Sequence, residues 1–115
     1  YYEPRCSPEG PAMGHSALSA IYSRMGNLEK ATELFAKSYK PNEVPPFGVL
    51  SETAGGTNPY FATGAGGFLQ AVMNGFGGLT ISDAGITQIK TKIPKTWKSL
   101  EIKGVGVTKV SFSVK

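Results

Sequence analysis

The stretch from Gly64 to Met73 constrains the fold most, because it reads as a helix with small or apolar residues on nearly every side. Phe68, Leu69, Val72 and Met73 form its larger apolar face. The small residues at its start allow another backbone, or a ligand, to approach closely. A helix of this kind is buried on several sides, and a chain of 115 residues offers it few partners. We therefore expect this chain to be part of a larger structure.

Two further helices are predicted before this one, in the region up to about Tyr39. In the first, apolar residues recur at helical spacing on one face, at Leu18, Ile21, Tyr22 and Met25. Gly26 ends that helix and Asn27 is a good N-cap for the next. The second helix has an apolar side made by Leu28, Ala31, Leu34 and Phe35. Glu33 and Lys37 support it at i, i+4 spacing, so we expect an antiparallel helical hairpin with a very short turn.

The remaining regions are a loop and a set of strands. From about Asn42 to Gly64 the sequence has no periodicity, and an unstructured loop of that length is more often functional than not. After Gly78, apolar and polar residues alternate as in half-exposed antiparallel strands. The expected strands begin at Leu79, run from Ile86 to Ile93 and from Lys98 to Lys103, and end with Val110, Phe112 and Val114 on one face. The sequence thus predicts an α+β chain.

Composition and charge exclude several classes of function. The net charge of +4 is concentrated after residue 89, where seven lysines accompany one acid, Glu101. These lysines alternate with apolar residues and lack arginine and a set of stacking aromatics, so we interpret them as a solvated sheet face rather than a nucleic-acid interface. Cys6 and His15 are the single cysteine and histidine, which excludes an internal disulfide and a Cys- or His-rich metal site. No apolar run is long enough to span a membrane.

The helical hairpin also matches one tetratricopeptide repeat. Tyr22, the Gly26-Asn27 turn, Ala31 and Phe35 fall close to the pattern of that repeat, and Pro41 follows where its late proline stands. Such repeats need about three or more copies to bury a continuous core, and no second copy is present. We therefore interpret the match as convergence on a helical hairpin.

A resemblance to a known family covers nearly the whole chain. The segments Ser7–Met13, Phe47–Glu52, Tyr60–Val72 and Gly75–Leu79 resemble the end of glycoside hydrolase family 65. That family holds maltose, trehalose and kojibiose phosphorylases together with hydrolases of α-glucosides. The resemblance implies an (α/α)6 catalytic barrel followed by a small antiparallel β-sheet domain. On this interpretation residues 1–78 are the C-terminal end of the barrel and residues 79–115 are the β-sheet domain.

The resemblance also implies a chemistry. Leu50-Ser51-Glu52 stands where the hydrolase branch carries its general base, which points to Glu52 as the base of an inverting α-glucoside hydrolase. Such an enzyme needs a second carboxyl group, and that acid is expected upstream, so the chain alone should be inactive. Two alternatives stay open. One is a disaccharide phosphorylase of the same family, and the other is a helical-repeat or carbohydrate-binding module without catalysis.

Four further residues are candidates for substrate binding: Glu9, His15, Tyr60 and Thr63. Each has a structural alternative, namely a helix-dipole carboxylate, a structural hydrogen bond, a loop anchor and a positioning contact. Trp97 is expected in the core. No metal or organic cofactor is implied. The expected partners are an α-glucoside oligosaccharide and the upstream part of the same polypeptide, without which the fragment is expected to self-associate. The sequence leaves the compartment open.

Overall fold

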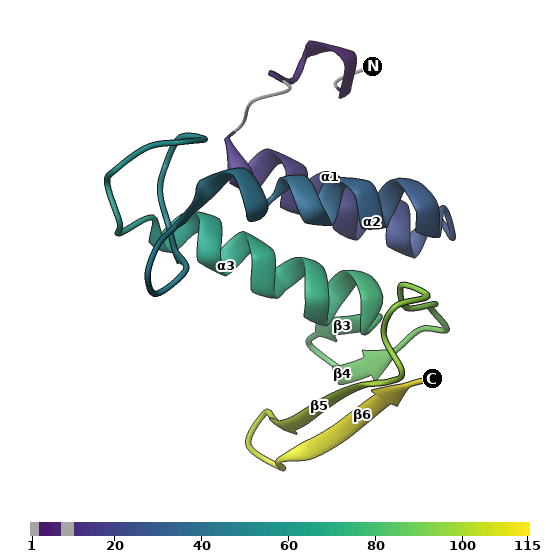
Figure 1. Ribbon diagram of the computed structural model, residues 1–115. Coiled ribbons are helices and arrows are strands. Elements are labelled where there is room, and N and C mark those ends of the chain that lie inside the picture. The colour runs from purple at the N-terminus through teal and green to yellow at the C-terminus, as the bar shows by residue number, and fades with distance from the viewer. Residues whose placement is uncertain (1–2, 8–10) are drawn as a thin grey trace.

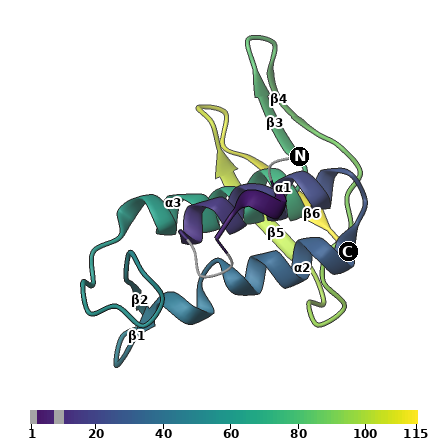
Figure 2. The same cartoon turned by 90° about the horizontal axis from the view of Figure 1, so that it is seen from above.

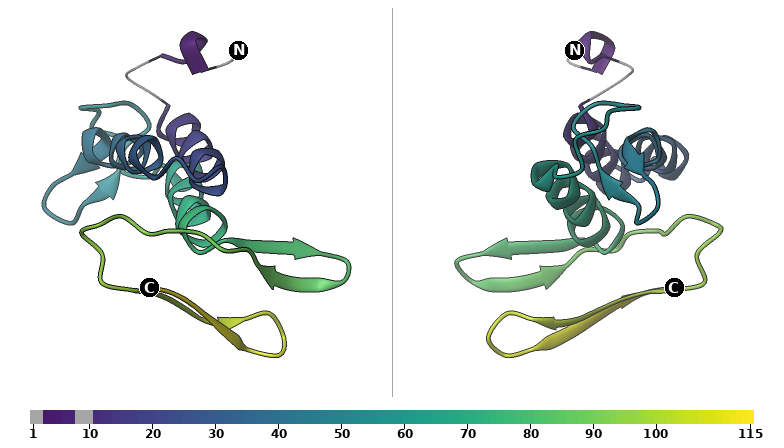
Figure 3. Two further views of the ribbon diagram at one scale, coloured as in Figure 1. Left: turned by 90° about the vertical axis from the view of Figure 1, so that its right-hand side faces the viewer. Right: turned by 60° about the vertical axis from the view of Figure 1, so that its left-hand side comes forward.

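The computed structural model describes residues 3–7 and 11–115, with three helices followed by two C-terminal β-hairpins and a small hairpin between the second and third helices (Figure 1). A short 3-10 turn, η1 (Glu3–Arg5), precedes the helices α1 (Ala12–Arg24) and α2 (Leu28–Lys37). After a loop come α3 (Ala62–Gln70) and its π-helical continuation η3 (Ala71–Phe76). Figure 3 shows the helices and the C-terminal hairpins as two layers, so the α+β prediction is confirmed.

The predicted helical hairpin is present, with the predicted turn chemistry. Gly26 adopts a positive φ of 83°, which a residue with a side chain would resist, and it lets the chain reverse between α1 and α2. Asn27 caps α2 by accepting a hydrogen bond from the amide of Lys30 at 3.1 Å. Glu33 and Lys37 form the expected i, i+4 ion pair at 2.7 Å. Gly26 and Asn27 therefore define the turn between α1 and α2, and the ion pair supports α2.

The predicted apolar face of α1 is wrong for Ile21 and Met25, whereas Tyr22 packs against the hydrophobic core as expected. The buried side of this helix consists of small or polar residues, namely Ala12, His15, Ser16, Ser19 and Ser23. Ile21 and Met25, which were expected to be buried, are 51% and 72% exposed. The reason is the close approach of α2, across which the Ser19 hydroxyl donates to the carbonyl of Ala31 at 2.8 Å. Short side chains fit between backbones at this spacing, whereas the larger apolar ones point outward.

The helix pair α1 and α3–η3 is packed just as closely through small residues. Gly67 lies against Ser16, and Gly75 lies against Ala20. A Cβ at Gly75 would stand only 2.9 Å from the Cα of Ala20. On the outer side, Leu69 remains 55% exposed. The small residues of α3 thus allow the predicted backbone approach, and part of its apolar surface stays uncovered.

This packing gives a first prediction. We expect Gly75→Ala to destabilise the fold by about 1–3 kcal/mol, because the added methyl group forces η3 away from α1. Gly66→Ala is the matched control, since nothing lies within 4 Å of its Cβ position, and it should stabilise α3 by about 0.5–1 kcal/mol. Thermal denaturation of both variants checks this. Equal midpoints would show that the α1–α3 spacing is not set at Gly75.

An aromatic cluster forms the core between the layers. The ring of Phe35 stacks on Phe68 at 4.8 Å and meets Phe76 edge-on at 5.2 Å. Phe76 is fully buried. Trp97 packs against both Phe35 and Phe76, at 5.7 and 5.2 Å between ring centroids. The prediction that Trp97 belongs to the core is confirmed, and this residue joins the C-terminal segment to the helices.

The expected β-sheet is instead a pair of separate two-stranded hairpins. Strand β3 (Leu79–Ser82) pairs antiparallel with β4 (Gly85–Gln88), and β5 (Leu100–Val105) pairs with β6 (Val110–Val114). The strand predicted to continue to Ile93 ends at Gln88. Its continuation leaves the hairpin because Ile93 is buried in the aromatic core and the Thr91 hydroxyl donates to the carbonyl of Phe76 at 2.6 Å.

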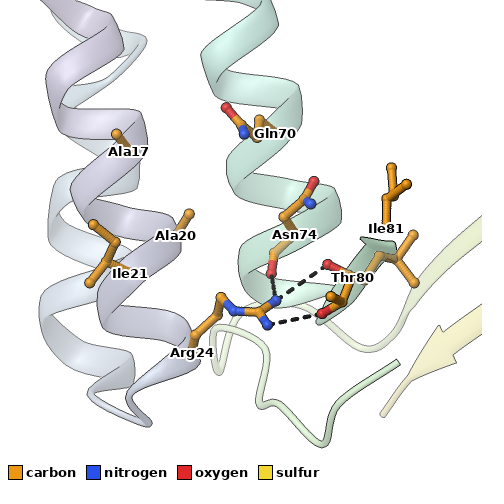
Figure 4. A pocket seen from close by; sticks show the side chains of 9 residues that line it. Ala17, Ala20, Ile21, Arg24, Gln70, Asn74, Thr80 and Ile81 are labelled. Carbon is orange, nitrogen blue, oxygen red and sulfur yellow. Dashed lines mark hydrogen bonds between the residues drawn. The ribbon is translucent and has the colours of Figure 1, made fainter. Parts of the chain in front are cut away.

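Arg24 ties the last turn of α1 to the start of the hairpin layer (Figure 4). Its guanidinium donates to the carbonyls of Asn74 and Leu79 at 3.0 and 3.3 Å. It also donates to the hydroxyl of Thr80 at 3.0 Å. A planar group with several donors suits this position, because three acceptors from η3 and β3 converge there. The two layers are therefore joined by polar contacts at the groove between α1 and α3 as well as by the core.

Candidate active site

The loop between α2 and α3 contains more regular structure than its sequence predicts. A 3-10 turn, η2 (Lys40–Asn42), leads into β1 (Glu43–Val44), which pairs antiparallel with β2 (Val49–Leu50). The register places Glu43 opposite Leu50. The expectation of a segment without structure is therefore wrong for its first part, and the pairing brings residue 51 back beside residue 42.

Asn42 and Ser51 lock the two sides of this loop together. The amide of Ser51 donates to the carbonyl of Asn42 at 2.8 Å, and the Asn42 side-chain amide donates back to the carbonyl of Ser51 at 2.9 Å. Both residues are buried, with 2% and 0% of their surface exposed. Hydrogen bonds shielded from water in this way hold the backbone firmly. Sequence reasoning did not single out Asn42 or Ser51, because their roles depend on the pairing of β1 with β2.

Glu52, the predicted base, follows this locked pair directly and is exposed. Its loop returns toward the helices, with the amide of Gly55 bonded to the carbonyl of Pro41 at 2.9 Å and the amide of Phe61 bonded to the carbonyl of Leu50 at 3.0 Å. Figures 1 and 2 show this loop at the end of the helical layer where α1 and α3 begin. Glu52 therefore has a hydrogen-bonded backbone around it and an exposed side chain.

His15 lies in the first turn of α1. The beginning of that helix is at the same end of the helical layer as this loop (Figure 2). Its side chain is 7% exposed, and neither ring nitrogen has a hydrogen-bond partner among residues 3–7 and 11–115. A buried imidazole without a partner loses the hydration that it would have in water. The structure therefore places His15 inside the helical layer rather than on an open surface.

Two of the other residues predicted to bind substrate, Tyr60 and Thr63, lie at the same end of the fold. Thr63 is exposed in the first turn of α3, and Tyr60 is 86% exposed. Tyr60 lines a shallow hollow of about 370 Å³ together with Val49, Leu50 and Phe61. Neither Glu52 nor Thr63 lines that hollow. Glu9 lies outside the described residues. The structure thus brings Glu52, Tyr60 and Thr63 to one end of the fold without assembling them into one pocket.

Among the described residues, three carboxylates have lowered pKa values, and none belongs to this loop. A hydrogen bond from the Tyr22 hydroxyl is the largest cause of the lowered pKa of Glu3. Hydrogen bonds from Lys37 and Lys30 lower the pKa of Glu33 on α2. A hydrogen bond from Lys103 lowers the pKa of Glu101 on β5. The pKa shifts of Glu33 and Glu101 reflect exposed charge pairs, which contribute little to stability. Both pairs lie apart from the residues of the predicted site.

Comparison with known proteins shows what the chain is similar to. It is 53% identical over 116 residues to kojibiose hydrolase of Mucilaginibacter mallensis, covering 100% of this chain and 17% of that protein. It is 50% identical over 114 residues to kojibiose hydrolase of Flavobacterium johnsoniae, covering 97% of this chain and 17% of that protein. The protein-glucosylgalactosylhydroxylysine glucosidase of Dictyostelium discoideum is 35% identical over 99% of this chain and 16% of its own length. No protein-family model matches.

The chain is a relative of glucoside hydrolases. It spans about a sixth of the length of these relatives, which agrees with the expectation of a larger protein. Within the described part of the chain, no helix is long and apolar enough to cross a membrane. The same residues contain no group of three or more side chains suited to holding a metal ion.

Proposed function

We propose that this chain is the C-terminal part of a longer, inverting hydrolase of α-linked glucosides that belongs to glycoside hydrolase family 65. Residues 1–78 would be the end of its (α/α)6 barrel and residues 79–115 its C-terminal β domain. The names of the relatives and the sixth of their length that the chain spans support this proposal. So does the change from helices to hairpins between Phe76 and Leu79.

The exposed apolar sides of α1 and α3 support a preceding part of the same polypeptide. Met13 and Ile21 on α1 are 46% and 51% exposed, and Leu69 on α3 is 55% exposed. Ala17 and Ile21 also line the groove between these helices (Figure 4). The earlier barrel helices would cover this surface in the whole protein. Without them, its apolar side chains would favour self-association of the fragment.

The proposal assigns the general base to Glu52. Its carboxylate would accept a proton from a water molecule while the water oxygen bonds to the anomeric carbon. An acid from the upstream part would donate its proton to the leaving glycosidic oxygen as the old bond breaks. The two carboxyl groups of such a site stand roughly 6.5–9.5 Å apart, which leaves room for the water. The exposed side chain of Glu52 on a hydrogen-bonded backbone is the observation that carries this assignment.

The remaining predicted residues receive supporting roles in the whole enzyme. Tyr60 presents an exposed ring that can stack on a sugar, and Thr63 presents a hydroxyl beside the N-terminus of α3. The His15 ring nitrogens have no hydrogen-bond partner among the residues that the structure describes, and they can bond a sugar hydroxyl where the upstream part completes the pocket. Glu9 would act at the sugar or at the water. The proposed substrate is an α-linked glucose disaccharide, with kojibiose suggested by the names of two relatives.

The test is product analysis with the full-length protein. We expect it to release glucose from kojibiose in phosphate-free buffer, because the relatives are named as hydrolases and a carboxylate follows Ser51. The glucose formed from the non-reducing unit should appear as the β-anomer in a proton NMR time course, giving an early excess of β over the equilibrium ratio, since direct attack by water inverts the α-linkage. An early excess of the α-anomer over the equilibrium ratio would contradict the inverting mechanism. A requirement for phosphate, with a sugar phosphate as product, would establish the phosphorylase instead.

A further inference from the structure

We propose that Asn42 and Ser51 are positioning residues that hold Glu52 in its catalytic place. This inference rests on the proposed function of Glu52 as the base. Asn42 ends η2 and Ser51 follows β2, so the two residues flank the small β1–β2 hairpin and lie outside the helices α1, α2 and α3. Neither is proposed to touch the substrate. Their effect is transmitted through the main chain of Glu52.

The contacts begin with a reciprocal pair of residues. The carbonyl of Asn42 accepts the Ser51 amide at 2.8 Å, while the Asn42 side-chain amide donates to the Ser51 carbonyl at 2.9 Å. The same Asn42 amide group also lies 3.4 Å from the carbonyl of Glu52. One side chain therefore holds two successive carbonyls, and the second belongs to the proposed base itself.

The hydroxyl of Ser51 extends this arrangement past Glu52. It lies 2.7 Å from the carbonyl of Thr53 and 3.1 Å from that of Asn42, and it can donate its single proton to either. The amide of Gly56 bonds to the same Thr53 carbonyl at 2.9 Å. The carbonyls of Ser51, Glu52 and Thr53 all have donors, so the peptide units on both sides of the Glu52 Cα are held.

Burial distinguishes the pair from the residue that they serve. Asn42 and Ser51 are nearly or fully buried, whereas the side chain of Glu52 is exposed to solvent. Buried hydrogen bonds resist exchange with water, and breaking one leaves an unsatisfied group. A general base must be placed to a fraction of an ångström relative to its water, and an error of about 1 Å can cost about 100-fold in rate. The pair supplies that precision.

The first test replaces Ser51 with Ala in the full-length protein. We expect kcat to fall about 10- to 100-fold while KM stays within about threefold, because the substrate is bound but the base is misplaced. Ser19→Ala is the matched control. Ser19 is equally buried and donates a 2.8 Å hydrogen bond to the carbonyl of Ala31, but it lies in the α1–α2 contact. Its kcat should stay close to that of the parent enzyme.

A double-mutant cycle separates positioning from general destabilisation. In the Glu52→Gln background, Ser51→Ala should lower the residual kcat by less than about twofold, since there is no base left to misplace. Asn42→Ala provides a second variant, and each is assayed well below its own melting temperature. Unchanged kcat in both single variants, or an equal loss in the presence and absence of Glu52, would overturn the positioning role. Full activity of Glu52→Gln would instead refute the proposed base, and the positioning role with it.

Discussion

Glu52→Gln is expected to lower kcat of the full-length protein about 1,000-fold if it has the proposed hydrolase activity, within the range that a general base contributes. The amide keeps the size of the side chain but cannot accept the proton of the attacking water. KM should change little, because the sugar is bound by other groups.

Glu43→Gln is the control for this experiment. Glu43 is another exposed glutamate of the same loop, in β1 opposite Leu50, and it has no proposed chemical role. Steady-state kinetics on kojibiose, with and without phosphate, measure both variants. If Glu52→Gln retains the parent rate, or if Glu43→Gln loses as much, then Glu52 is not the base.

Phe76→Ala should lower the free energy of unfolding by about 3–5 kcal/mol, which is the largest effect on stability that we expect. The Phe76 ring is fully buried and contacts both Phe35 and Trp97, so its removal leaves a cavity where the helices meet the C-terminal segment. The fall in stability can be followed as faster hydrogen–deuterium exchange in peptides of α2 and η3 of the full-length protein.

Phe47→Ala removes the same ring from a position that is 87% exposed, between β1 and β2. Its effect on the free energy of unfolding should stay within about 0.5 kcal/mol, because removing an exposed ring leaves no cavity in the core. Similar exchange in both variants would mean that the aromatic cluster does not hold the two layers together.

The two helices of the hairpin differ in how well their sequences predicted their packing. In α2 the apolar residues are the buried ones, and Ala31, Leu34 and Phe35 face the core as their spacing indicates. In α1 the same kind of spacing selected Ile21 and Met25, which are exposed. Hydrophobic periodicity assumes that the larger apolar residues face the core. That assumption fails where the neighbouring backbones come close and only small residues fit between them.

The candidate site divides in the same way. The family resemblance identified Glu52 through the residues that flank it in the sequence, and its role as base remains a prediction. The sequence offered no comparable signal for Asn42, whose hydrogen bonds reach residues nine and ten positions later. Such contacts appear only when β1 and β2 pair and bring residues 42 and 51 side by side. His15 was visible as a single histidine, but its burial without a hydrogen-bond partner in the described chain was not.

Short-range chemistry was sufficient for the order of the elements, the capped turn at Gly26 and Asn27, and the polar-apolar alternation of the last strand, β6. Each of these depends on residues within a few positions of one another, so their signals survive in the linear sequence. Three features depended on packing. They are the buried face of α1, the division of the strands into separate hairpins, and the hydrogen bonds between Asn42 and Ser51 next to Glu52. They are set by how closely distant backbones approach, by Ile93 entering the core, and by hydrogen bonds across the β1–β2 loop.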